Sequence, residues 1–185
     1  MADCRARFWQ VDLKVCAMIE YKNIEAEDIE AFWSFLGTLD LETEFMMYEP
    51  GERDKHTSLS ELGHEIQTNV IGGEDHICIA LHEKKIVGYI HAERGRFQRN
   101  RHTAYVVVGI LKRYRSKGIG TALFAQLDRW AKEDHIRRLE LTVECPNQAA
   151  QRLYEKSGFV VEGIRKNAMY VDGQYIDEYY MAKIL

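Results

Sequence analysis

The chain has 185 residues, of which 46% are hydrophobic and 11% aromatic, so it can bury the core of one domain spanning residues 1–185. Its formal net charge of −4 argues against nonspecific binding to nucleic acid, which needs a basic surface. Charges interrupt residues 1–21 and no run of about 18 uncharged apolar residues occurs, so we expect a cytoplasmic protein without a signal peptide or membrane association.

One strand and two helices are expected in the first part of the chain. The apolar run 15–21 predicts a strand, and the helical spacing of apolar residues over 24–39, with acidic residues in the first turn, predicts a helix. Segment 40–54 is acidic, contains Met and aromatic residues, and is expected to be irregular. A second helix is expected to begin at a serine and to end before two glycines. Its expected bounds are Ser58 or Ser60 and Asn69, followed by Gly72-Gly73.

A hairpin and a strand–loop–helix unit follow. The apolar runs 76–82 and 86–93 predict an antiparallel hairpin. After a loop rich in arginine, the nearly unbroken apolar run 104–111 is typical of a strand buried on both faces. A basic, Gly-containing loop leads to a helix with apolar residues at the amphipathic period from Ile119 to near Asp134.

The last part of the chain is expected to hold three strands and one helix. A strand over 138–145 is broken by Pro146, and Asn147 is a plausible N-cap of a helix that ends at Gly158. Strands over 159–170 and 175–182 are joined by an Asp-Gly pair, a strong hairpin signal. The predicted order is therefore β-α-α-β-β-β-α-β-α-β-β.

The cysteines and histidines indicate neither metal nor disulfide chemistry. The four cysteines lie far apart, and neither they nor the seven histidines show metal-ligand spacing. We therefore expect no bound metal. The cysteines are Cys4, Cys16, Cys78 and Cys145.

The loop after strand 104–111 predicts an anion site. It carries four cations and two glycines where free N–H groups and the positive dipole end of the next helix coincide, which suits a phosphate. A Walker loop is a poor match, because Thr121 follows Gly120 with no lysine between them. The loop also departs from the dinucleotide-binding pattern, because Leu123 occupies the position of the third small residue. Glu140 on the next strand keeps the dinucleotide-binding alternative open.

The pattern Arg115-x-x-Gly118-x-Gly120 resembles the diphosphate loop of the GNAT superfamily of acetyl-CoA-dependent N-acetyltransferases, Gln/Arg-x-x-Gly-x-Gly/Ala. A second family segment is similar too, and it comprises Asn147, Ala150, Leu153-Tyr154 and Gly158-Phe159. Lys112 departs from the family, whose members often have Pro there. The resemblance implies an α/β (α+β) fold: a mixed, mostly antiparallel twisted sheet of about six to seven strands flanked by about four helices. The sheet is expected to be splayed at the central strand 104–111.

The resemblance also implies how acetyl-CoA is held. The pantetheine arm would pair with the strand near Ile110 and Leu111 like an added strand, and Asn147 would hydrogen-bond the arm or act only as an N-cap. Gly109 is expected to mark the bulge that opens the sheet, with a packing glycine as the alternative. The diphosphate would contact the loop residues Arg115, Ser116, Lys117, Gly118, Ile119, Gly120 and Thr121.

The implied chemistry is direct attack of an amine on the thioester. An N–H of Ile110 or Leu111 would stabilise the oxyanion, and Tyr154 would protonate the departing thiolate as the catalytic general acid. A covalent intermediate on Cys145 is disfavoured, because nothing in the sequence activates that thiol. The base is left open among three carboxylates, Glu93, Glu144 and Glu44.

The acceptor is expected to be an amine-bearing substrate. The acidic segment 40–52 and the final hairpin would border its site, and the carboxylates could attract a cationic amine or simply be solvated. The residues concerned are Asp40, Glu42, Glu44 and Glu49, with Tyr170, Tyr175 and Tyr179. Two other functions remain open, a noncatalytic acyl-CoA-binding sensor and a dinucleotide-binding protein. A homodimer is compatible with the resemblance, since dimers are common in the family.

Overall fold

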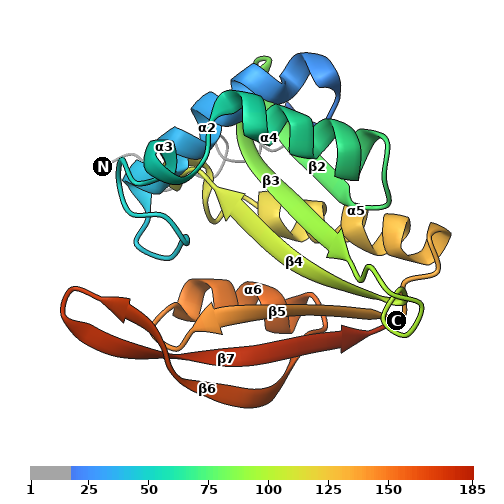
Figure 1. Cartoon of the computed structure of the whole chain (residues 1–185). Helices are drawn as coiled ribbons and strands as arrows, with labels where there is room; N and C mark the ends of the chain where they lie inside the picture. Colours follow the sequence, from blue (N-terminus) through green and yellow to red (C-terminus); the bar gives the residue numbers. More distant parts are fainter. Residues whose placement is uncertain (1–17) are drawn as a thin grey trace, which may run out of the picture.

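Seven strands form one mixed sheet in the order β1-β2-β3-β4-β5-β7-β6 (Figure 1). The computed structural model describes residues 18–185 of the chain. Neighbouring strands are antiparallel except β4 and β5, which are parallel. The strands are β1 Ile19–Asn23, β2 His76–His82, β3 Lys85–Arg94, β4 Thr103–Ile110, β5 Arg138–Glu144, β6 Val160–Val171 and β7 Gln174–Ile184. The predicted class is confirmed, and the predicted order of elements is confirmed except for α3, Arg53–His56, a short helix that the sequence did not indicate.

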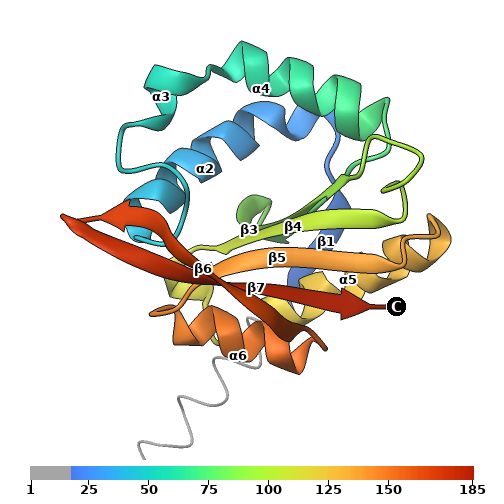
Figure 2. The same ribbon diagram turned by 60° about the horizontal axis from the view of Figure 1, so that its bottom comes forward.

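Helices cover both faces of the sheet, with α2, α3 and α4 on one side and α5 and α6 on the other (Figure 2). A separate cluster of buried apolar residues fills the space on each side. The helices are α2 Ile29–Glu42, α3 Arg53–His56, α4 Leu59–Glu65, α5 Ile119–Glu133 and α6 Gln148–Lys156, and the shorter turns are η1 Ala26–Asp28, η2 Ile66–Ile71 and η3 Lys112–Tyr114. Within residues 18–185, no helix combines the length and the apolar character needed to cross a bilayer.

The sheet opens between its two parallel strands. β4 pairs with β3 along its whole length, but it pairs with β5 only where Thr103–Tyr105 meet Arg138–Glu140. The rest of β4, residues 106–110, therefore presents an edge of backbone N–H and C=O groups to a gap. The predicted splay at the central strand is confirmed.

The bulge predicted at Gly109 is wrong. The register between β3 and β4 runs without a shift from Arg94↔Ala104 to Gly88↔Ile110. A Cβ atom at Gly109 would lie 2.4 Å from Leu39 Cδ2 and 2.7 Å from Tyr89 Cε1, so this position requires glycine for close packing. The register shift in this part of the sheet lies instead between β2 and β3, at Ala80 and Leu81.

The N-terminal elements differ in their bounds from the prediction. β1 runs from Ile19 to Asn23, and residues 15–17 of the predicted strand lie outside the described residues. The first helical segment begins in a capping box of Glu25 and Asp28 rather than at Asn23, and α2 continues to Glu42. Apolar periodicity predicts an earlier end for this helix, at residue 39, because its last turn is held by contacts that are distant in sequence.

The second helix has Ser58, one of its two predicted starts, as N-cap, but it changes its winding and extends two residues beyond the predicted end at Asn69. The Ser58 hydroxyl accepts a hydrogen bond from Glu61 N at 3.3 Å, which is an N-cap. From Ile66 to Ile71 the helix continues as the π-helical segment η2 and ends at Gly72. Such segments are rare and occur frequently at functional sites.

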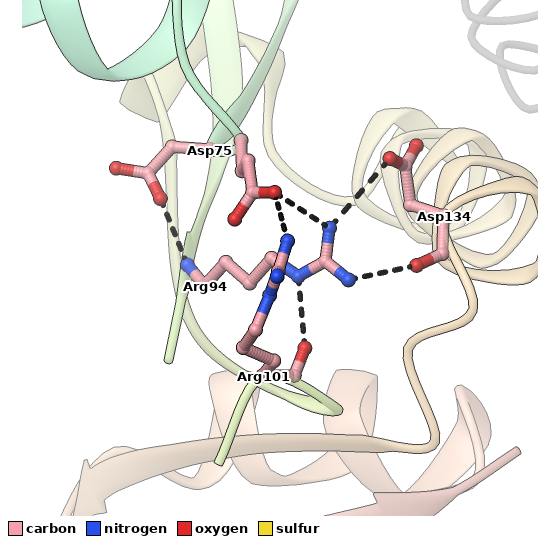
Figure 3. A network of polar contacts seen from close by, with 5 residues as sticks. Asp75, Arg94, Arg101 and Asp134 are labelled. Carbon is pink, nitrogen blue, oxygen red and sulfur yellow. Dashed lines mark hydrogen bonds and ion pairs between the residues drawn. The ribbon is translucent and has the colours of Figure 1, made fainter. Parts of the chain in front are cut away.

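A polar network fastens the β3–β4 hairpin to the end of α5 (Figure 3). The backbone N–H of Arg94 donates to Asp75 Oδ1 at 2.9 Å. Its guanidinium donates to the carbonyl oxygens of Arg101 at 2.8 Å and of Asp134 at 3.2 Å. Asp134 is the C-cap of α5, so one arginine satisfies a helix-end carbonyl and complements the negative end of the dipole.

Candidate active site

The loop between β4 and α5 leaves backbone N–H groups unpaired at a helix start. Gly118 is left-handed, with φ +81°, and α5 begins at the next residue. The Ala122 N–H donates to Gly118 O at 3.0 Å, so the N–H groups of residues 119–121 precede the first bond of the helix ladder. With the positive end of the helix dipole they form a site suited to an anion such as a diphosphate.

A cavity of about 430 Å³ opens beside this corner, at the splayed end of β4. We call it the splay cavity. Its wall includes most of the predicted site residues, namely Ile110, Arg115, Ser116, Gly118, Gly120, Thr121, Asn147 and Tyr154. Leu111, Lys117 and Ile119 are not part of that wall. The functional roles of all these residues stay predictions.

Part of the wall comes from residues that were not singled out. Leu39, at the end of α2, and Thr43, Phe45 and Met46 after it close one side. Their sequence signal is weak, since only the acidic loop as a whole was placed near the site. On α6 the wall adds Ala149 and Lys156, together with Ala150 and Leu153 of the second family segment. Of these four, only Ala150 shares the helix face of Tyr154, since it lies four residues before it.

At the end of β4, the backbone N–H groups of Ile110 and Leu111 point in opposite directions. The Leu111 N–H donates to Val87 O at 3.0 Å and therefore points toward β3. Backbone groups alternate in direction along a strand, so those of Ile110 point toward the splay. The Ile110 carbonyl accepts a hydrogen bond from Arg115 Nε at 2.9 Å. Of the two predicted oxyanion donors, only Ile110 has its N–H on the cavity side.

Gly120 has a packing reason that the loop pattern did not reveal. A Cβ atom there would lie 2.7 Å from Leu153 Cδ2 and 3.4 Å from Ile110 Cδ1. The glycine therefore lets the start of α5 approach both α6 and β4. This close approach brings the N–H groups of α5 and the side chains of α6 to one cavity.

Tyr154 is buried in the wall of the splay cavity, with 8% of its surface exposed. Its ring packs edge-on against Phe124, with centroids 5.8 Å apart. The hydroxyl has no hydrogen-bond partner among residues 18–185, so it is available to a bound molecule. Burial, and then the nearby Tyr105, raise the pKa of the Tyr154 phenol above its ordinary value, which keeps it protonated at neutral pH.

Of the two roles that the sequence left open for Asn147, capping is observed, and binding of the pantetheine arm stays a prediction. Its side-chain oxygen accepts a hydrogen bond from Ala150 N at 3.2 Å, so it is the N-cap of α6. It also lies in the wall of the splay cavity. The amide NH₂ has two donors of its own, which capping by the oxygen does not use.

The candidate bases lie in different places. Glu144 ends β5 and is 8% exposed, and burial, then Glu178 and Glu44, raise the pKa of its carboxyl. Glu44 is exposed. Glu93 lies in a second cavity, bordered by β3, α2 and α4, and not in the wall of the first. Glu144 and Cys145 are also outside the wall of the splay cavity.

Two carboxylates of the acidic segment are structural ligands. Asp40 is buried and accepts hydrogen bonds from Arg53 Nε at 2.6 Å and Nη2 at 2.9 Å. Glu42 accepts one from the backbone N–H of Lys112 at 2.6 Å and so ties α2 to the loop before α5. Neither carboxylate is simply solvated. The tyrosines of the final hairpin, Tyr170, Tyr175 and Tyr179, line neither of the two cavities.

Comparison with known sequences identifies similar proteins. The profile of the Acetyltransferase (GNAT) family matches residues 36–159. The chain is 31% identical over 110 residues to the L-amino acid N-acetyltransferase AaaT of Escherichia coli K12, covering 57% of this chain and 66% of that protein. It is 40% identical over 84 residues to the uncharacterized N-acetyltransferase YycN of Bacillus subtilis, covering 44% of this chain and 52% of that protein. These alignments thus span less than two thirds of each relative.

Solved structures share the fold over nearly the whole chain. A GNAT-family acetyltransferase from Streptococcus pneumoniae superposes with a TM-score of 0.85 at 30% identity, covering 90% of this chain and 99% of that one. A phosphinothricin acetyltransferase from Sinorhizobium meliloti, solved in complex with acetyl-CoA, superposes with a TM-score of 0.78 at 20% identity, covering 91% and 89%. The second likeness concerns the fold alone.

Proposed function

The chain belongs to the acetyltransferase (GNAT) family and is an acyltransferase, and we propose that it transfers an acetyl group from acetyl-CoA to a primary amine of a small molecule, protein or peptide. The observation that carries the proposal is the composition of the splay cavity. A single space joins an open strand edge, the N–H groups at the start of α5 and a protonated phenol. These are the parts needed to hold a thioester and to stabilise charge that forms on it.

Acetyl-CoA would be held by two elements of the chain. The N–H groups of residues 119–121, with the Arg115 guanidinium, would take the diphosphate, and Ser116 and Thr121 add hydroxyls to the same wall. The open edge of β4 at Ile110 would pair with the amides of the pantetheine arm. Leu111 holds this edge in place through its bond to Val87, and Lys117 contributes positive charge beside the loop.

The reaction proceeds by direct transfer in a ternary complex. As the amine nitrogen bonds to the acetyl carbon, the Ile110 N–H stabilises the oxygen that becomes negative. The carbon–sulfur bond then breaks, and Tyr154 donates its proton to the departing thiolate. The attacking nitrogen releases its extra proton to water, solvent reprotonates the phenolate, and the released products are the N-acetylated amine and coenzyme A. No cysteine is needed, because the amine attacks the thioester directly.

Glu144 is the carboxylate that we assign as acceptor of the ammonium proton, directly or through one water. Its raised pKa makes it a better base than an exposed carboxylate, and it lies next to the splay at the end of β5. Replacement by Gln should lower kcat by about 100-fold and abolish the acidic limb of the pH–rate profile. Glu20→Gln, on the edge strand β1, is the control. An unchanged acidic limb in the Glu144 variant would exclude this assignment.

The function is tested by release of coenzyme A from acetyl-CoA across a panel of primary amines. We expect amine-dependent thiol release and binding of acetyl-CoA by calorimetry. Tight acetyl-CoA binding without transfer to any amine would instead indicate an acyl-CoA sensor. Binding of NAD in preference to acetyl-CoA would favour the dinucleotide-binding alternative, and absence of any affinity for acetyl-CoA would refute the proposal.

A further inference from the structure

A second cavity of about 250 Å³ lies between β3 on one side and α2, α4 and η2 on the other. Three polar side chains of β3 line it, namely Tyr89, His91 and Glu93. They are two residues apart, so they project from the same face of the strand. We call these three residues the β3 row.

The second cavity adjoins the splay cavity. Tyr89, in its wall, packs against Gly109, which lines the splay cavity. The loop after α2 forms walls of both spaces, through Phe45 in the first and Tyr48 in the second. The β3 row therefore runs outward from the reacting end of the site.

Two members of the β3 row have polar atoms without a hydrogen-bond partner among residues 18–185. Tyr89 is 5% exposed, and its hydroxyl has no hydrogen-bond partner in the part of the chain that the structure describes. His91 Nε2 is shielded from solvent and unpartnered too. Burial lowers the pKa of His91, so its imidazole is neutral near pH 7 and one ring nitrogen is an acceptor. Buried polar groups without partners cost free energy unless a ligand satisfies them.

The charges around the cavity leave a negative excess. Arg53 is paired with Asp40, and Asp75 is paired with Arg96 at 2.6 Å. Glu65 and Glu93, which also line the cavity, have no Lys or Arg partner within residues 18–185. The His91 imidazole approaches Glu93, with Nδ1 3.9 Å from Oε1. A cation at the outer end of the row would be paired there.

We propose that the second cavity binds the distal ammonium group of an acceptor that carries two amines on an extended chain, with Tyr89 near the reacting amine and Glu93 at the far one. An ammonium has three donors and no acceptor, which complements a wall of a phenol, an imidazole and a carboxylate. Glu93 lies four residues beyond Tyr89 on an extended strand, which places the two about 13 Å apart. The substrate class is therefore a long linear diamine or polyamine. This inference rests on the proposed function, because it assigns the acceptor of that same site.

Calorimetry on the full chain with coenzyme A present tests the inference without requiring turnover. Diaminooctane, with amines at both ends, should bind about tenfold more tightly than octylamine, since a charge-assisted hydrogen bond contributes about 1.5–3 kcal/mol. Glu93→Gln should remove most of that difference. Glu133→Gln, an exposed carboxylate at the end of α5 on the opposite face of the sheet, is the matched control and should not change it.

Equal affinities of the two amines, or an unchanged difference in Glu93→Gln, would overturn the inference. Melting curves check the fold of the variant, and Glu65→Gln, on the exposed rim, provides the same charge loss if Glu93→Gln is unfolded. The two proposals fail separately. Acetylation of octylamine with the same KM as diaminooctane would refute the diamine site and leave the transferase function intact. Glu93-dependent diamine binding without acetyl transfer would refute the transferase function and leave the diamine site intact.

Discussion

The ring and the hydroxyl of the Tyr154 side chain have different surroundings. Its ring is fixed by aromatic neighbours, while the oxygen has no partner within residues 18–185. A structural tyrosine buried to this degree usually hydrogen-bonds its hydroxyl. Packing and chemistry are thus separable at this residue, which makes it suitable for substitution.

Tyr154→Phe should lower kcat by about 100-fold while the Kd for acetyl-CoA stays within about twofold, because only the proton donor is lost. Its free energy of unfolding should change by less than about 0.5 kcal/mol, since no internal hydrogen bond is broken. Steady-state kinetics, calorimetry and urea denaturation measure these three quantities. Tyr175→Phe, on an exposed tyrosine of the β6–β7 hairpin, is the control. Normal turnover of Tyr154→Phe would remove this residue from the mechanism.

The loop and helix start after β4 form an element whose glycines are required for different reasons. Gly118 needs its left-handed backbone, whereas Gly120 needs the absence of a Cβ against Leu153. The shared Gly-x-Gly pattern therefore reflects one conformational and one packing requirement. Both bring the N–H groups of α5 to the splay cavity.

Gly118→Ala should weaken acetyl-CoA binding by about tenfold, because a left-handed alanine costs about 1–2 kcal/mol and displaces the N–H groups at the start of α5. Gly173→Ala is the matched control, since Gly173 has φ +79° and no atom within 4 Å of an added Cβ. It should lose similar stability and keep its affinity for acetyl-CoA. Calorimetry beside denaturation distinguishes the two effects. Equal affinity losses in both variants would mean that the loop has no special role.

A second prediction about a single structural element concerns the end of α5. Arg94→Met should lower the free energy of unfolding by about 2–3 kcal/mol, because the carbonyls of Arg101 and Asp134 lose charge-assisted donors. Urea denaturation measures this loss. Arg99→Met, exposed in the same hairpin loop, should change stability by less than about 0.5 kcal/mol. A similar loss in both variants would show that the network of Figure 3 contributes little to stability.

On the scale of the whole molecule, the sheet is held between two apolar layers that each enclose a neutral histidine. His76 stacks on Trp130 of α5, with centroids 4.9 Å apart, and His91 faces the helices of the other side. Burial, then His91, lowers the pKa of His76 to about 4, from 6.5. As the pH falls below about 6.5, the unfolded chain takes up this proton before the folded chain does.

The free energy of unfolding should therefore be constant with respect to His76 above about pH 6.5 and fall by about 3 kcal/mol between pH 6.5 and 4. Denaturant titrations at several pH values measure the slope. His76→Phe keeps an aromatic ring for Trp130 but cannot be protonated, so its profile should be flatter. His64→Gln, on an exposed histidine of α4, is the control. A wild-type slope in His76→Phe would exclude His76 as the cause.

Much of the fold could be predicted from patterns among residues that are close together in the sequence. The Asp172-Gly173 turn, the Asn147 cap and the order of strands and helices depend on residues a few positions apart, where periodicity and turn chemistry are informative. The resemblance added the splay, which residue patterns alone do not indicate. Gly109 shows the limit, because a glycine in a strand is equally compatible with a bulge and with close packing until its neighbours are known.

By itself the sequence determined the class of fold, the family, and the loop and tyrosine from which the reaction is proposed, since each is marked by residues close together in the chain. Only the tertiary structure decided which of Ile110 and Leu111 points its N–H toward the cavity, that Glu42 binds the loop 70 residues away, and that Tyr89 separates two adjoining spaces. These features depend on which faces meet when distant segments pack together. That packing minimises exposed apolar surface over the whole chain, so no local pattern records it.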